Sequence, residues 1–139
     1  MFKNVTKNQD LGLLVCRLIV AICMFSHGAL KFAGGIPKLI HTGAGLANFG
    51  LTEGYLFWGV VAAVTECAGA ILVGIGLFSR LVSFLLVCTM IVATSVDAHK
   101  GYMAALDPVV YGAIYLMVLI GGPGKYSLDY MIEQRKYNQ

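Results

Sequence analysis

Four long apolar blocks alternate with short polar segments along this chain. The blocks occupy residues 11–32, 55–78, 81–98 and 108–121. A helix needs about 20 apolar residues to cross a hydrocarbon core about 30 Å thick, and the first three blocks approach that length. The pattern therefore predicts an all-α integral membrane protein built as a bundle of four transmembrane helices.

The fourth block is too short to cross the membrane alone, since about 14 residues cover only about 21 Å of helix. Either residues 102–106 extend it through a kink at Pro108, or Asp107 caps a short helix whose first residue is Pro108. We favour the cap, because aspartate followed by proline is a strong helix start signal. This choice places a carboxylate at a helix N-terminus just below the membrane surface.

The first block has some features of a signal peptide, because Lys3 and Lys7 precede the apolar run. However, the run is about twice the usual length, contains Arg17 and lacks a small-residue cleavage site. We therefore interpret it as the first transmembrane helix.

The segment between the first two blocks, residues 33–54, is longer than a plain connector. Apolar residues recur at roughly helical spacing after Pro37, which predicts a short interfacial helix broken near Gly43 and Gly45. Such a helix could cover the outer mouth of the bundle as a lid, and a loop resting on the membrane is the alternative. The apolar positions are Ile36, Leu39, Ile40, Leu46, Ala47 and Phe49.

Basic residues predict the orientation, because lysine and arginine in short loops favour the cytoplasmic side. With four spans both termini share one side. That side carries Lys3, Lys7, Arg80, Lys125, Arg135 and Lys136. The other side carries Lys31, Lys38 and Lys100. The bias predicts that both termini are cytoplasmic and that residues 33–54 are external.

Composition excludes most other classes of protein. Hydrophobic residues make up 58% of the chain and charged residues 12%, with a mean hydropathy of +0.79, so the apolar surface needs lipid around it. The apolar blocks leave little room for a soluble module, and we predict one transmembrane domain over residues 1–139. The net charge of +3 comes from basic residues scattered at membrane flanks. Nucleic-acid binding has no support, and homo-oligomerisation stays open.

Two ionisable residues lie deep within the predicted spans, where a charge is costly and by default marks a site or a buried pair. Arg17 lies about 10 Å above the cytoplasmic end of its helix and Glu66 lies near the midplane. A long guanidinium reaching upward could meet the carboxylate, so we predict an Arg17–Glu66 pair. The pair is either purely structural or leaves Glu66 to accept and relay a proton.

A second polar group lies toward the external ends of the spans and consists of His27, Lys31, Asp97, His99, Lys100 and Asp107. His27 lies about 15 Å above Arg17 by helix rise, the level expected for His99. Because histidine titrates near neutrality, these two imidazoles could hydrogen-bond a carbonyl ligand and carry its protons. The lysines are also typical of interfacial anchors, without a ligand.

The four cysteines, Cys16, Cys23, Cys67 and Cys88, all fall within spans. Their spacing fits neither a disulfide framework nor a metal site, so we predict no metal. A thiol role is conceivable for Cys16 and Cys23, which share a helix stripe with His27. We interpret all four as small packing residues.

The order of these residues resembles the DoxX family of small bacterial membrane proteins, whose wider group includes DoxD-like subunits of thiosulfate:quinone oxidoreductase. The resemblance covers nearly the whole chain, but Asp107 stands where a glutamate is expected early in the fourth helix. It rests on Arg17, Ser26-His27-Gly28-Ala29-Leu30-Lys31, Glu66, Ala98-His99-Lys100-Gly101 and Gly122-Pro123-Gly124-Lys125-Tyr126-Ser127-Leu128-Asp129.

The resemblance implies a multi-pass protein of the bacterial cytoplasmic membrane. Relatives include membrane subunits of oxidoreductases, partners in an oxidative-stress assembly, and maturation factors for periplasmic redox enzymes. Redox chemistry at the membrane is what they share. The resemblance therefore implies that this chain serves as the membrane subunit or partner of an oxidoreductase system, with a soluble or membrane redox protein beside it.

We hypothesise that a quinone or similar amphiphile binds in the outer half of the bundle. His27 and His99 would contact its head group, and Glu66, Arg17 and Asp107 would handle protons. The predicted reactive groups are thus Glu66, His27 and His99, and the predicted ligand contacts are Arg17, Lys31, Asp97 and Asp107. Two alternatives stay open: a non-catalytic scaffold or assembly factor for a partner protein, and a b-type haem held by His27 and His99.

Overall fold

The computed structural model describes residues 2–137, with side chains from residue 8 onward. Every regular element in this part of the chain is helical. The elements are α1 (Phe2–Ala33), α2 (Gly35–Gly43), the 3₁₀ helix η1 (Ala44–Phe49), α3 (Tyr55–Ile75), α4 (Ser79–Asp97), the 3₁₀ helix η2 (Ala98–Lys100), α5 (Tyr102–Gly121) and α6 (Leu128–Tyr137).

Within residues 2–137, four helical stretches are long and apolar enough to cross a membrane, which confirms the predicted fold class. The stretches are Asn8–Ala33, Tyr55–Ile75, Ser79–Lys100 and Tyr102–Gly121. The chain is therefore a multi-pass membrane protein whose apolar outer surface faces the lipid bilayer.

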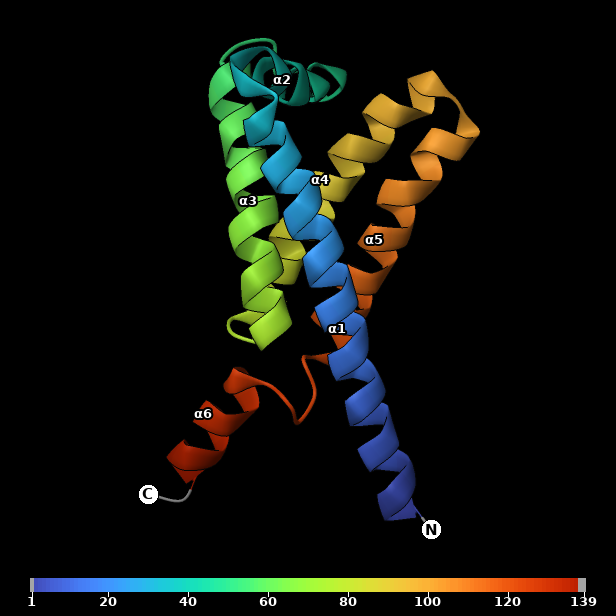
Figure 1. The fold of residues 1–139 in the computed structure, drawn as a ribbon, viewed down its shortest axis with the longest axis vertical. Coiled ribbons are helices and arrows are strands. Elements are labelled where there is room, and N and C mark those ends of the chain that lie inside the picture. Colours follow the sequence, from blue (N-terminus) through green and yellow to red (C-terminus); the bar gives the residue numbers. More distant parts are fainter. Residues whose placement is uncertain (1, 138–139) are drawn as a thin grey trace.

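The spans form two closely packed pairs, α1 with α3 and α4 with α5 (Figure 1). The pairs lie closest together in the half of the bundle nearer the start of α1, and they diverge toward the end covered by α2 (Figure 1). Helix α6 lies at the same end as the start of α1 (Figure 1). We call this the terminal end and the opposite one the α2 end. The core side chains are Val20, Met24, Ala70, Val73, Val82, Leu86, Met90 and Tyr115.

The predicted start of the last span was wrong. Helix α5 begins at Tyr102, directly after Gly101, and continues through Pro108, whose ring is buried within the helix. Asp107 is an exposed residue of this helix and does not cap it. The longer helix gives 20 residues, enough to cross the hydrocarbon core, and this length outweighs the one backbone hydrogen bond that proline removes.

The predicted interfacial helix is present as α2, followed by η1, and the chain changes helix type at Gly43. Two glycines let α2 press directly on the start of α3. A Cβ on Gly43 would overlap the carbonyl oxygen of Tyr55, and a Cβ on Gly59 would overlap the carbonyl oxygen of Leu39. Helix α2 is therefore fixed in place by backbone contact, as the small-residue face of α3 allows.

Gly43→Ala should separate α2 from α3 and lower the free energy of unfolding by about 1–3 kcal/mol, the usual range for overpacking. Thermal unfolding in mild detergent measures this loss. Gly12→Ala is the matched control, because a Cβ added at that position would meet no neighbouring atom within 4 Å. Equal melting temperatures for the two variants would show that the contact does not hold α2.

The last loop of the chain closes the terminal end of the bundle around Arg17. The guanidinium is fully buried and donates from Nη1 to the Pro123 carbonyl and from Nη2 to the Tyr126 carbonyl, both at 2.6 Å. We call Arg17 and these two carbonyl groups the C-terminal clasp. The predicted Arg17–Glu66 pair is therefore wrong, because the guanidinium is occupied by backbone oxygens.

Asp129 adds a second attachment between the tail and the spans. Its carboxylate accepts hydrogen bonds from the backbone N–H groups of Phe78 and Ser79, both at 2.8 Å, at the start of α4. Its own backbone N–H donates to the Gly76 carbonyl at 2.9 Å. An anion at a helix N-terminus is favoured by the unpaired N–H groups and the helix dipole. The conspicuous tail motif is thus a structural element of the fold.

Candidate functional site

The relative sliding of α1 and α3 decides which charged groups meet. A Cβ on Gly28 would touch Ala63 and Cys67, and a Cβ on Gly74 would touch Ala21. The helices are antiparallel, so this register sets Glu66 opposite the last turns of α1. Arg17 lies by Gly76, ten residues beyond Glu66 and about 15 Å lower in helix rise.

Lys31 is the residue that this register brings to Glu66. Its Nζ lies 2.5 Å from Glu66 Oε1, and the two side chains are 19% and 1% exposed. The second oxygen, Oε2, is buried without a hydrogen-bond partner among the described residues. The free oxygen of such a buried carboxylate can take up a proton, and the carboxylic acid so formed can release it again.

A cavity of about 510 Å³ opens beside this pair, between the diverging helix pairs and beneath α2. Its walls come from α1, α2, η1, α3, α4 and η2. The polar lining consists of His27, Lys31, Lys38, His41, Thr42, Trp58, Thr65, Cys88, Thr89, Asp97 and Lys100. The remaining wall is apolar or glycine. This combination of an apolar wall with a few polar groups is typical of small-molecule sites.

The predicted site residues divide into two sets. His27, Lys31 and Asp97 lie in the cavity wall, and Glu66 lies directly behind Lys31. Arg17, His99 and Asp107 are not part of the wall: Arg17 belongs to the C-terminal clasp, and the other two are exposed.

Asp97 is half-buried and its Oδ1 accepts from Lys100 Nζ at 2.6 Å, one helical turn away. His27 instead contacts α5, and its ring meets Tyr111 edge to face with centroids 5.6 Å apart. Such a contact holds the imidazole plane in a fixed direction. His27 is thus an oriented polar group between the cavity and α5.

Two tyrosines of α5 complete the polar interior, and neither was predicted from the sequence. Tyr115 is 0% exposed, and its hydroxyl has no hydrogen-bond partner among the described residues. The sequence held one signal for them: Tyr111 and Tyr115 are four residues apart in a mainly apolar helix, so their hydroxyls lie on the same helix face.

Lys38 and His41 face the cavity from α2, and neither was predicted to bind a ligand. Both positions follow from α2 lying against α3, a contact that hydropathy does not reveal. No group of three or more His, Cys, Asp or Glu side chains in the described residues 8–137 is arranged to hold a metal ion. The cysteines in that range are free thiols, partly buried except for Cys88.

The fold and site together define a four-span membrane protein with an ion pair and a polar cavity between its helices. The DoxX family model matches residues 12–100, well over half of the chain, so this protein belongs to the DoxX family. Membership indicates a membrane protein of the oxidoreductase-associated type. Comparisons with curated proteins and with solved structures give no match.

Proposed function

We propose that this protein binds a quinone or similar amphiphile in the cavity beneath α2 and works with an oxidoreductase system of the bacterial cytoplasmic membrane. The observation that carries the proposal is the cavity of about 510 Å³ whose wall places His27 and Lys31 beside a buried carboxylate. The terminal end then faces the cytoplasm, in line with the distribution of basic residues, and α2 faces outward.

The polar groups have different proposed roles according to their positions. His27 and Lys31 are placed to donate hydrogen bonds to a carbonyl oxygen of the head group, and the apolar wall excludes water around it. Glu66, with one free oxygen behind Lys31, is placed to hold a proton beside the cavity. A bound quinone would supply two-electron, two-proton chemistry. His99, Asp107 and Arg17 have no part in this arrangement.

Trp58 offers a direct assay, because it is the only tryptophan in the chain and lies in the cavity wall. Quenching of its fluorescence during titration with a short-chain quinone reports binding. His27→Ala should weaken binding about fivefold, the loss expected for one hydrogen bond of about 1 kcal/mol. His99→Ala is the matched control and should bind like the unchanged protein. Equal quenching curves for all three proteins would exclude the proposed head-group contact.

A scaffold function is the second candidate, and α6 favours it. This helix extends away from the spans (Figure 1), and residues 131–137 are all exposed. The C-terminal clasp holds its base against the bundle, as a docking element for a partner protein requires. A b-type haem finds no comparable support, because His99 is not part of the cavity wall and the His27 ring packs against Tyr111.

A further inference from the structure

The cavity carries more positive than negative charge. Lys31, Lys38 and Lys100 line it, together with one acidic residue, Asp97. Lys100 is paired with Asp97, and Lys31 is paired with Glu66 behind the wall. Among residues 8–137, no acidic side chain forms an ion pair with Lys38. Lys38 is therefore the surplus cation of the cavity.

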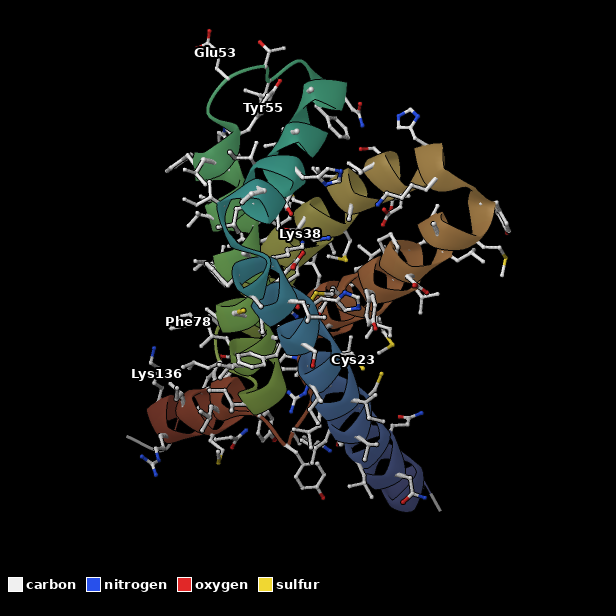
Figure 2. All side chains as sticks on the ribbon, turned by 45° about the horizontal axis from the view of Figure 1, so that its top comes forward. Cys23, Lys38, Glu53, Tyr55, Phe78 and Lys136 are labelled. Atoms are coloured by element: carbon white, nitrogen blue, oxygen red, sulfur yellow. The ribbon has the colours of Figure 1, made fainter. Side chains whose placement is uncertain are left out.

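The backbone of Lys38 is held over the cavity, and its side chain is exposed at the mouth. Its helix is fixed to α3 by the backbone contacts of Gly43 and Gly59, and the Thr42 hydroxyl donates to the Lys38 carbonyl at 2.9 Å. Figure 2 shows Lys38 over the interior of the bundle, whereas Glu53 lies at the far edge of the α2 end. Glu53, the acidic residue nearest to Lys38 in sequence, therefore lies away from it. The Lys38 ammonium group stays available to a ligand.

Below the lysine most of the cavity wall is apolar, although Thr65, Cys88 and Thr89 lie among the aliphatic residues. Val61 of α3 and Leu85 and Val92 of α4 form facing parts of the wall, while Lys38 and His41 lie on α2 at the mouth. A ligand that satisfies both zones has an apolar chain between the helices and a charged head group beneath α2. A cationic head group would meet uncompensated positive charge, and a neutral one would form no ion pair with Lys38, whose side chain is exposed at the mouth.

We propose that this cavity, besides the neutral head group of a quinone, accepts an amphiphile with a negatively charged head group, of the carboxylate or phosphate type, which pairs with Lys38. The inference rests on the proposed function, because it names a second ligand class of the same cavity. His41, one helical turn beyond Lys38, is a second donor to the same anion.

The test compares dibrominated stearic acid with the matching dibrominated stearyl alcohol, because bromine quenches a tryptophan at short range. The protein is placed in phosphatidylcholine nanodiscs and Trp58 fluorescence is followed. The acid should bind about three- to tenfold more tightly than the alcohol, since an ion pair at a partly exposed mouth contributes about that much. A competing alkyl phosphate reports whether phosphate or carboxylate is preferred.

Lys38→Gln should abolish most of the preference for the acid, and Lys38→Glu should reverse it. Lys125→Gln is the control, because Lys125 pairs with Asp10 and does not line this cavity. Equal affinity for acid and alcohol, or a preference that persists in Lys38→Gln, would overturn the inference. If a short-chain quinone still quenches Trp58 in that case, the proposed function survives. If neither the quinone nor either lipid quenches it, both fail.

Discussion

Lys31→Met should lower the free energy of unfolding by about 3–5 kcal/mol, because it leaves the Glu66 carboxylate without its cation in a site only 1% exposed. Glu66→Leu alone leaves a partly buried ammonium group that can still turn toward water, so its effect should be smaller. The double variant Lys31→Met with Glu66→Leu should recover much of the stability, since an apolar pair of similar volume needs no counter-ion.

Thermal unfolding of the three variants in mild detergent measures this coupling. Lys100→Met is the matched control, because it breaks an ion pair of the same type at an exposed position and should change stability by less than about 1 kcal/mol. Strict additivity of the two single losses would show that Lys31 and Glu66 do not interact in the folded protein.

Arg17→Leu should release the C-terminal tail and lower the free energy of unfolding by about 3–6 kcal/mol. The loss follows from two hydrogen bonds donated by a charged group, each contributing about 1.5–3 kcal/mol. The stability of Arg17→Lys should lie between that of Arg17→Leu and that of the unchanged protein, because an ammonium group lacks the planar fork that reaches both carbonyls at once.

Release of the tail has a readout separate from stability. Trypsin should cleave the Arg17→Leu protein after Lys125 faster than the unchanged protein, since the loop is no longer held. Lys125→Leu would remove the cleavage site, so the control is Asp10→Asn. This change weakens the half-exposed ion pair with the Lys125 ammonium group and keeps an amide oxygen that can still accept from the Lys125 backbone N–H. Tail cleavage at the same rate in Arg17→Leu and in the unchanged protein would contradict the role given to the clasp.

Hydropathy predicted the spans well because the bilayer acts on each helix separately. A helix must satisfy its own backbone and present apolar side chains over a fixed thickness, and both requirements are local in sequence. The same reasoning failed at Pro108, where helix length outweighed a local start signal. Helix α6 was not predicted, because its polar sequence carries no periodic signal of this kind.

The site was harder to predict because it depends on how far one helix slides along another. Gly28 against Ala63 and Cys67 sets that register, and a small shift would have changed the partner of Glu66. The sequence showed which charges were buried but not that Lys31, rather than Arg17, would reach the carboxylate. The backbone contact between α2 and α3, which turns Lys38 toward the cavity, was hidden for the same reason.

The C-terminal clasp also orders events during synthesis. Arg17 leaves the ribosome 106 residues before Pro123, its first hydrogen-bond acceptor. At about 5–20 residues per second, about 5–20 s pass before that acceptor exists. During this interval the guanidinium lies about 10 Å inside its span, a depth from which a long side chain can reach toward the lipid head groups. The first helix therefore inserts with Arg17 contacting lipid head groups. The guanidinium exchanges them for the loop carbonyls only when the last loop has been made.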